Sequence, residues 1–301
     1  MKILLLGKNG QVGWELQRAL QPLGQVIALD RAQSQDGLCG DVCDFDMMQQ
    51  LITTLRPDVV VNATAYTAVD LAESEQKQAD AVNHLAVANL AKLCSAQDIL
   101  LIHYSTDYVF SGEGHRPWRE DDISQPINYY GVSKRNGEEA LDASSVNFMN
   151  FRTSWVYATQ GNNFIKTMLK LAKTKQELNI IQDQIGAPTG AALIADVTAQ
   201  VLSYYFLQPC EHRHALHGHY HLVAQGETTW FDYAQYIFAQ AQHHGAHLMI
   251  EAVHPIQSKE YPTAAKRPLN SRLNTQKLQS TFNIHLPHWQ HGVDQVIQEI
   301  L

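Results

Sequence analysis

Short apolar runs alternate with amphipathic stretches along the first half of the chain. Residues 2–6, 25–29, 56–62 and 99–102 have the length and the Leu, Ile and Val content of buried strands. Between them, apolar residues recur at helical spacing, most clearly over residues 45–55. Strands that alternate with helices at this pitch are typical of a parallel sheet covered on both faces. The pattern therefore predicts an α/β fold with a doubly wound, Rossmann-like parallel sheet.

A glycine-rich turn follows the first of these strands. Gly7, Gly10 and Gly13 lie between the strand at 2–6 and a helical pattern at 14–20, which is the context of a dinucleotide-binding fingerprint. In such a turn the first glycine permits the tight bend, the second lets the backbone approach a pyrophosphate, and the third allows close packing of helix on strand. The N-terminus of the helix would then face the phosphates.

The end of the second strand carries the residues that bear on cofactor choice. Asp30 comes roughly 20 residues after the glycine turn, where an acidic side chain usually binds the adenosine ribose and favours NAD. Arg31 could instead receive the 2′-phosphate of NADP. Both interpretations stay open, and we expect NADPH or NADH to be used.

Tyr130 and Lys134 provide a candidate proton-transfer pair. They are four residues apart and would share one face of a helix. A nearby ammonium would lower the pKa of the phenol from about 10, so that Tyr130 could protonate a ketone oxygen as a hydride reaches the carbon. Thr106, which follows the apolar run at 99–102, offers a hydroxyl to the same oxygen. A solvated helix face would show the same spacing, so the hypothesis depends on the surrounding motifs.

Four other polar or aromatic residues have two interpretations each. We expect Asn83 to be a solvent-facing amide on a helix, and His103 to be a core histidine near the site rather than a catalytic base. Asp107 would bind either substrate or the local backbone. Trp155 follows a strand at 147–151 and would either line a substrate site or belong to the core.

Two charged clusters stand out in the second half of the chain. Five histidines lie between residues 212 and 221, but they alternate along an expected strand with few acidic partners, so a metal site is the weaker interpretation. The basic segment at residues 266–272 would meet a diphosphate if it faced the cleft, and would otherwise be a surface loop.

The second half of the chain contains three elements split by loops, which suggests its domain organisation. We expect residues 1–155 to form the NAD(P)-binding domain, which carries the candidate threonine, tyrosine and lysine. Residues 156–301 would form mainly a smaller substrate-binding domain, interleaved with part of the first. A helix at 192–206 and another that begins at a threonine cap near residue 229 are predicted within it.

Composition excludes several classes of partner. The 301 residues carry a formal net charge of −8 and no basic run, which argues against nucleic acid. No apolar run approaches the roughly 20 residues of a membrane span, and the N-terminal run is too short for a signal peptide. The four cysteines lack the spacing of a disulfide framework or metal site. We therefore expect a cytoplasmic protein without nucleic-acid or membrane partners.

Six segments together carry a resemblance to a known family. They are residues 7–13 (GKNGQVG), 62–70 (NATAYTAVD), 103–110 (HYSTDYVF), 130–134 (YGVSK), 151–157 (FRTSWVY) and 186–189 (GAPT). Over essentially its whole length the chain resembles the extended short-chain dehydrogenases/reductases, and among them the family of dTDP-4-dehydrorhamnose reductases. The resemblance implies reduction of the C4 ketone of dTDP-4-dehydro-L-rhamnose to dTDP-L-rhamnose with NADPH or NADH.

The same resemblance implies a set of site residues. Thr106, Tyr130 and Lys134 would be catalytic, and Thr106, Asp107 and Trp155 would contact the sugar nucleotide. The cofactor would be lined by Gly10, Gln11, Val12, Asp30, Asp41, Val42, Ala65, Tyr66, Thr67, Tyr104, Tyr130 and Lys134, together with Gly7, Gly13 and Arg31 of the two strand ends discussed above.

A metal ion and a homodimer are left open by the resemblance. Some members of the family bind Mg²⁺ at a dimer interface through glutamates, one of them just after the segment at 186–190. Here that position is Ala192, whereas Glu299 could serve as a retained ligand.

Two alternative functions share this scaffold. A nucleotide-sugar epimerase or dehydratase needs further acid and base groups near the threonine, and the Asp-Glu pair typical of a dehydratase is missing because Tyr108 follows Asp107. A non-catalytic, cofactor-binding regulatory subunit, like the partner of methionine adenosyltransferase in the same family, is the second. The intact threonine, tyrosine and lysine favour an enzyme.

Overall fold

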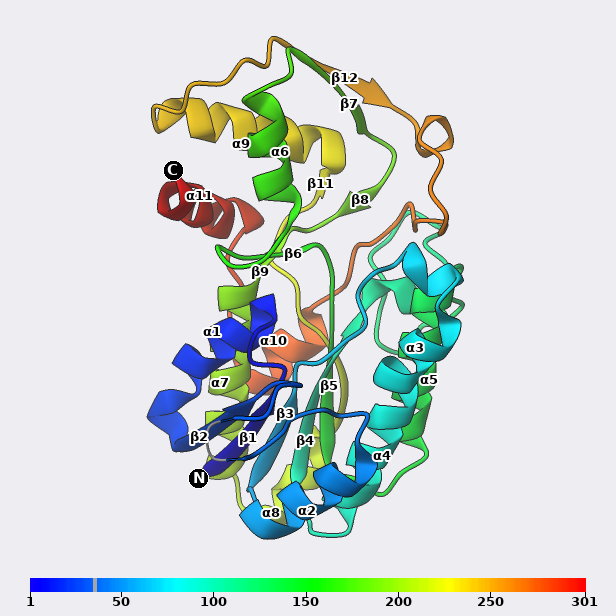
Figure 1. The fold of residues 1–301 in the computed structure, drawn as a ribbon, viewed down its shortest axis with the longest axis vertical. Coiled ribbons are helices and arrows are strands. Elements are labelled where there is room, and N and C mark those ends of the chain that lie inside the picture. Colours follow the sequence, from blue (N-terminus) through cyan, green and yellow to red (C-terminus); the bar gives the residue numbers. More distant parts are fainter. Residues whose placement is uncertain (35–36) are drawn as a thin grey trace.

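Six parallel strands form the central sheet of the larger lobe (Figure 1). The computed structural model describes residues 1–34 and 37–301. Every neighbouring pair of strands is parallel, and the order reverses between β1 and β3. The crevice at the carboxyl ends of these two strands is where such sheets bind ligands. The predicted doubly wound α/β fold is confirmed. In spatial order the strands are β2 (Gln25–Leu29), β1 (Lys2–Leu6), β3 (Val59–Asn62), β4 (Leu100–Thr106), β5 (Phe148–Thr153) and β10 (Gly218–His221).

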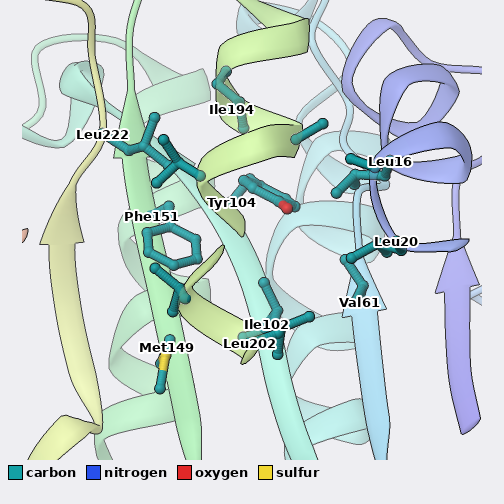
Figure 2. Close-up of a cluster of buried hydrophobic side chains, with 14 of the residues drawn as sticks. Leu16, Leu20, Val61, Ile102, Tyr104, Met149, Phe151, Ile194, Leu202 and Leu222 are labelled. Atoms are coloured by element: carbon teal, nitrogen blue, oxygen red, sulfur yellow. The ribbon is translucent and has the colours of Figure 1, made fainter. Parts of the chain in front are cut away.

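Helices cover both faces of this sheet and bury its apolar strands. One face packs against α1 (Gln11–Ala19), α7 (Ala191–Leu207) and α10 (Gln276–Phe282). Figure 2 shows Leu16 of α1 and Ile194 of α7 converging on the sheet near Tyr104. The opposite face packs against α2 (Phe45–Leu55), α4 (Ala86–Ser95) and α5 (Tyr129–Asp142). Burial on both faces explains why the strands are continuous apolar runs rather than alternating ones.

A smaller lobe lies above the carboxyl ends of the strands (Figure 1). Its core is formed by residues of three helices, α6 (Phe164–Ala172), α9 (Trp230–His243) and α11 (Trp289–Ile300). The chain passes between the lobes repeatedly, since α7 and β10 belong to the larger one. The functional division at residue 155 stays a prediction. Three pairs of short strands complete this lobe: β7 (Glu177–Ile181) with β12 (Ala252–Ile256), β6 (Val156–Tyr157) with β9 (Thr189–Gly190), and β8 (Ile185–Gly186) with β11 (Thr228–Thr229).

Side-chain caps fix where the functionally important helices begin. The Asn128 side chain accepts a hydrogen bond from the Gly131 backbone N–H at 2.8 Å, which starts α5 just before Tyr130. The predicted threonine cap is confirmed, because Thr229 Oγ1 accepts from the Asp232 N–H at 3.0 Å. Two remaining helices, α3 (Gln76–Asp80) and α8 (Cys210–Arg213), are short. Across residues 1–34 and 37–301, no helix combines the length and apolar character that a membrane crossing needs.

The segment before α4 differs from its prediction. The helix is interrupted by a π-helical turn at Ala81–Leu85, and Asn83 within it is only 1% exposed. The expectation that Asn83 faces solvent is therefore wrong, because the wider turn directs this side chain into the protein. Gly137 of α5 lies against the turn: a Cβ there would come within 2.2 Å of the Asn83 carbonyl oxygen. The glycine is needed for this close approach of α5.

Candidate active site

The glycine turn after β1 is shaped by backbone contacts. Gly7 has φ +87°, and a Cβ at this position would lie 2.9 Å from the backbone of Ala63 and Thr64 at the end of β3. A Cβ on Gly13 would come within 2.0 Å of the Gly7 carbonyl oxygen. These two glycines therefore allow the turn, the start of α1 and the end of β3 to lie against one another. Gly10 occupies the N-cap of α1 and offers no side chain to cap the first-turn N–H groups.

A crevice of about 800 Å³ opens beside this turn, between the ends of β1, β2 and β3. Gln11 and Val12 were predicted to contact the cofactor but do not line this crevice. The Asn163 amide donates to Gln11 Oε1 at 3.1 Å, and Val12 packs on the core. Tyr104, Tyr130 and Lys134 are not among the residues that line this crevice. The predicted residues that do line it are Gly7, Gly10, Asp30, Arg31, Asp41, Val42, Ala65, Tyr66 and Thr67. Further residues that line it, outside that predicted set, are Asn9, Ala32, Gly40, Cys43, Ala63, Thr64, Ala68, Gln78 and Val82.

Asp30 and Arg31 lie at the mouth of the crevice with different partners. The Asp30 carboxylate accepts hydrogen bonds from the Ala32 backbone N–H at 2.8 Å and from the Asn9 side chain. The Arg31 side chain is exposed beside it. Asp30 is therefore held in place by the protein, while the guanidinium of Arg31 lies in solvent at the same edge.

Asn83 ties one wall of the crevice to α5. Its Oδ1 accepts from the Tyr66 backbone N–H at 2.9 Å, and its Nδ2 donates to the Tyr66 carbonyl at 3.0 Å and to Ser133 Oγ at 3.0 Å. Ser133 Oγ in turn donates to the Tyr130 carbonyl at 2.8 Å. A single buried amide thus fixes the wall at 65–67 relative to the helix that carries Tyr130 and Lys134. A polar residue within an apolar-periodic stretch was the signal for this role.

Tyr130 and Thr106 lie together at the carboxyl end of β4. Both are buried, and Thr106 Oγ1 donates to Asp107 Oδ1 at 3.1 Å. Burial raises the pKa of Tyr130 to about 12, although the Thr106 hydroxyl partly offsets the increase. Tyr108 packs edge-on to the Tyr130 ring with 5.5 Å between the ring centroids. The phenol is therefore a neutral, protonated group in a desolvated site.

Lys134 binds to strand β4, and its expected role of lowering the pKa of Tyr130 stays a prediction. Its Nζ donates to the Tyr104 carbonyl at 2.6 Å and lies 3.3 Å from His103 Nε2. Burial lowers the pKa of Lys134 to about 8, against the opposing effect of Glu138. Both Tyr130 and Lys134 are desolvated, and desolvation disfavours the phenolate and the ammonium alike.

His103 is neutral and oriented by its neighbours. Asn62 Oδ1 accepts from the Thr64 N–H and hydroxyl, and the Asn62 Nδ2 lies 3.2 Å from His103 Nδ1. The other ring nitrogen, Nε2, lies 3.3 Å from Lys134 Nζ. Burial, with the nearby charge of Lys134, lowers the pKa of His103 well below its ordinary value. The side chain belongs to the buried support of the site, as expected from the sequence.

Tyr104 contributes its backbone rather than its side chain. The phenol is buried among the apolar residues of β4 and α7 and lies 2.9 Å from Thr198 Oγ1 (Figure 2). Only the carbonyl of Tyr104 meets Lys134.

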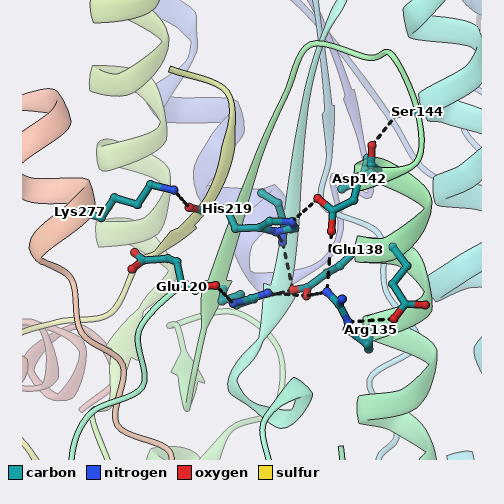
Figure 3. Close-up of polar contacts among 11 residues, drawn as sticks. Glu120, Arg135, Glu138, Asp142, Ser144, His219 and Lys277 are labelled. Carbon is teal, nitrogen blue, oxygen red and sulfur yellow. Dashed lines mark hydrogen bonds and ion pairs between the residues drawn. The ribbon is translucent and has the colours of Figure 1, made fainter. Parts of the chain in front are cut away.

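A buried ion pair involves Glu138, which follows Lys134 by four residues on α5 and is labelled in Figure 3. Glu138 is 0% exposed, and its two carboxylate oxygens accept from Arg152 Nε at 2.8 Å and Nη2 at 2.7 Å. Burial alone would raise the pKa of Glu138, but the Arg152 guanidinium outweighs it and holds the pKa well below its usual range. The pair anchors α5 to β5.

Among the histidines at 212–221, His219 joins this polar network, whereas His217 and His221 make contacts outside it. His219 bridges Asn150 and Asp142, each at 2.8 Å, and Figure 3 shows His219 beside Asp142. His217 lies 3.1 Å from the Tyr205 hydroxyl, and the His221 ring lies 3.1 Å from the carbonyl oxygen of residue 274. In the described ranges, 1–34 and 37–301, no group of three or more His, Cys, Asp or Glu side chains could hold a metal ion.

Two charged residues suggested by the sequence also have protein partners. Glu299 Oε1 accepts from Gln295 Nε2 at 3.1 Å, and its proposed use in binding Mg²⁺ at a homodimer interface stays a prediction. In the basic segment at 266–272, Arg267 Nη2 lies 2.6 Å from Asp70 Oδ2. This ion pair connects the C-terminal segment to the wall of the crevice.

Comparison with known proteins gives likenesses that extend over the chain. The family model described as RmlD substrate binding domain matches residues 1–301. A dTDP-4-dehydrorhamnose reductase of Escherichia coli (strain K12) is 49% identical over 300 residues, which covers 100% of this chain and 98% of that protein. The spore coat polysaccharide biosynthesis protein SpsK of Bacillus subtilis (strain 168) is 34% identical and covers 99% of this chain and 97% of its own length. The crystal structure of dTDP-4-dehydrorhamnose reductase from Bacillus anthracis in complex with NADP superposes with a TM-score of 0.88 at 30% identity, with 99% of each chain covered.

Proposed function

The chain belongs to the RmlD substrate-binding-domain family, and from this we propose that it is a dTDP-4-dehydrorhamnose reductase that uses NADPH or NADH. The reaction adds a hydride to C4 of dTDP-4-dehydro-L-rhamnose and a proton to its oxygen, which gives dTDP-L-rhamnose. The nicotinamide supplies the hydride, and the chain supplies the proton and the geometry.

The crevice beside the glycine turn fits a dinucleotide. Gly7 and Gly13 allow the turn and the start of α1 to pack closely, and Gly10 would let the backbone approach a pyrophosphate, whose oxygens the uncapped N–H groups at the start of α1 would bind. Asp30 would bind the adenosine ribose, and Arg31 would bind a 2′-phosphate. Asp41, Val42 and residues 65–67 would line the rest of the crevice. Family members with NADP bound, such as the Bacillus anthracis enzyme, support this assignment.

Tyr130 would donate the proton to the ketone oxygen. Burial raises its pKa to about 12, so at neutral pH the phenol holds the proton that the reduction consumes. Thr106 lies beside it and would orient the same oxygen. Lys134, one helical turn along α5, would stabilise the phenolate that remains after transfer.

Asp107 and Trp155 would contact the sugar nucleotide. Asp107 is 2% exposed, and its Oδ2 has no hydrogen-bond partner in the part of the chain that the structure describes. A sugar hydroxyl that donates to this oxygen would satisfy a buried acceptor. Trp155 follows β5 at the same edge of the sheet as Thr106, since Thr153 and Thr106 are paired in register.

The observation that carries the proposal is that Thr106, at the end of β4, lies beside Tyr130 of α5, the helix that also carries Lys134 and that Asn83 joins to the wall of the crevice. A proton donor is thereby held in fixed relation to the place where a nicotinamide dinucleotide would bind. This arrangement is the one that ketone reduction needs.

The direct test is oxidation of NADPH and NADH in the presence of enzymatically prepared dTDP-4-dehydro-L-rhamnose, with identification of the sugar formed. We expect oxidation that depends on the sugar and yields dTDP-L-rhamnose. Cofactor binding without oxidation would contradict the proposal and favour a regulatory, cofactor-binding role. Interconversion of a nucleotide sugar without net cofactor oxidation would indicate an epimerase.

A further inference from the structure

Trp155 has an unusual backbone conformation for its position. Its φ is +48°, in the left-handed region that residues other than glycine rarely adopt. The other described non-glycine residues with positive φ are Arg56 and Asn283, which end helices, and Asp98, which lies in the turn after α4. Trp155 instead lies two residues beyond the central strand β5, immediately before β6. Such a conformation persists only where the surroundings determine it, and such residues gather at functional sites.

The ring of Trp155 is also held in an unusual contact. The indole stacks face to face on Trp230, with 3.6 Å between ring centroids and 15° between the planes. Aromatic pairs generally prefer offset or edge-on arrangements at larger separations. The ring lies against Gly186 as well, where a Cβ would come within 2.8 Å of the indole. Gly186 has no left-handed φ, so its lack of a side chain matters here for space alone.

Trp230 is itself anchored in the smaller lobe. It occupies the first turn of α9, which Thr229 caps. Its Nε1 donates to Gln184 Oε1 at 3.0 Å, and Gln184 Nε2 donates to Ser258 Oγ at 2.9 Å. The ring of Phe164 packs against Trp230 with 4.6 Å between centroids. Trp230 therefore presents a fixed surface to Trp155.

We propose that Trp230 and Gly186 are positioning residues that hold Trp155 as a rigid wall for the sugar ring of the nucleotide sugar. The proposal rests on the proposed function, which places Trp155 at the substrate. Two departures from relaxed geometry, in the backbone and in the stacking, coincide at this one residue. A ring fixed in advance loses no further freedom when substrate binds, so the contact favours affinity and orientation.

The test compares substitutions on both surfaces that hold the ring. The variants are Trp230→Phe, Trp230→Leu and Gly186→Ala, with Gly190→Ala as the matched control in the neighbouring short strand. A Cβ at residue 190 would meet nothing closer than 3.4 Å. For each protein, KM for dTDP-4-dehydro-L-rhamnose and kcat are measured at saturating NADPH. The Kd of NADPH and the near-ultraviolet circular dichroism are measured separately.

Trp230→Leu and Gly186→Ala should each raise KM for the nucleotide sugar about tenfold, with the Kd of NADPH unchanged within twofold. Trp230→Phe keeps a flat ring and should raise KM less. The electronic transitions of two closely stacked indoles are coupled, which gives the pair its own near-ultraviolet circular dichroism signal. This signal should disappear in both Trp230 variants. Gly190→Ala should match wild type in every measurement.

The inference is overturned if Trp230→Leu and Gly186→Ala both keep KM for the nucleotide sugar within twofold of wild type. If Trp230→Leu does not fold, Gly186→Ala and Trp230→Phe decide the question by the same criterion. A wild-type protein that binds NADPH but does not reduce the sugar overturns the proposed function, and this inference with it. That failure differs from the first because it is seen before any residue is changed.

Discussion

Lys134 Nζ lies 2.6 Å from the backbone carbonyl oxygen of Tyr104, a contact that fixes the lysine to strand β4. Tyr130, Lys134 and Glu138 follow one another at four-residue intervals on α5, and all three are buried. One helix face therefore carries the proposed proton donor, the lysine and one half of an ion pair. The position of this helix decides whether the site is assembled.

Replacing Glu138 by Gln should destabilise the protein strongly. The substitution leaves Arg152 buried without its carboxylate, and breaking a buried pair in this way typically costs about 3–5 kcal/mol. The free energy of unfolding from urea denaturation measures the loss. Glu139→Gln is the matched control, because Glu139 is 59% exposed and pairs with Arg135 at 3.1 Å. An exposed pair contributes about 0–1 kcal/mol, so equal losses at residues 138 and 139 would contradict the role given to Glu138.

Replacing Asn83 by Ala should weaken cofactor binding. The change removes three hydrogen bonds that hold Tyr66 and Ser133, and roughly 1 kcal/mol for each suggests at least a tenfold rise in the Kd of NADPH. Fluorescence titration of NADPH measures this directly. Asn89→Ala provides a control, since Asn89 Nδ2 has no partner in the described part of the chain. If both variants bind NADPH as wild type does, Asn83 does not support the crevice.

Local pattern was sufficient to predict much of the fold. The strands at 2–6 and 25–29 and the helix at 45–55 have the predicted bounds, because each is a continuous apolar or amphipathic segment with clear turn residues beside it. Asn83 was misjudged because the π-helical turn that buries it depends on close packing of α5 against that turn at Gly137. This contact joins two segments that are distant in the sequence, so no local sequence pattern indicates it.

The electrostatics of the candidate site could not be predicted from spacing. The four-residue interval correctly places Tyr130 and Lys134 on one helix, but their pKa values depend on how fully each is buried and on the Tyr104 carbonyl. No sequence pattern indicated a contact between Trp230 and Trp155. The two residues are distant in the sequence, and only the fold brings their rings together.

Asp107 should make stability depend on pH. Burial raises its pKa to about 7, so the folded protein holds a proton that the unfolded chain, with an ordinary carboxyl pKa near 4, has already released. The stabilisation is fully present below pH 4 and is lost as pH rises through 7, by at most roughly 4 kcal/mol. Asp107→Asn should therefore gain stability relative to wild type between pH 5 and pH 8. Urea denaturation at these two pH values measures the difference, and parallel curves for the two proteins would count against a buried, protonated Asp107.

Arg31 should govern preference between the two cofactors. Arg31→Ala removes the cation that would meet a 2′-phosphate, whereas Asp30 keeps its contacts with Ala32 and Asn9. We expect KM for NADPH to rise roughly tenfold, with KM for NADH unchanged. Steady-state kinetics with both cofactors provides its own control, since NADH lacks the phosphate. An equal effect on both cofactors would show that Arg31 acts on the crevice as a whole.

The most direct test of the central claim compares Tyr130→Phe with Tyr129→Phe in the reduction of dTDP-4-dehydro-L-rhamnose by NADPH. Both changes remove one phenolic hydroxyl from the first turn of α5, but only Tyr130 lies beside Thr106. Loss of a positioned general acid should reduce kcat for Tyr130→Phe by about 10²–10⁴-fold and leave the Kd of NADPH unchanged, while Tyr129→Phe stays close to wild type. Turnover by Tyr130→Phe within a few-fold of wild type would contradict the assignment of Tyr130 as the proton donor.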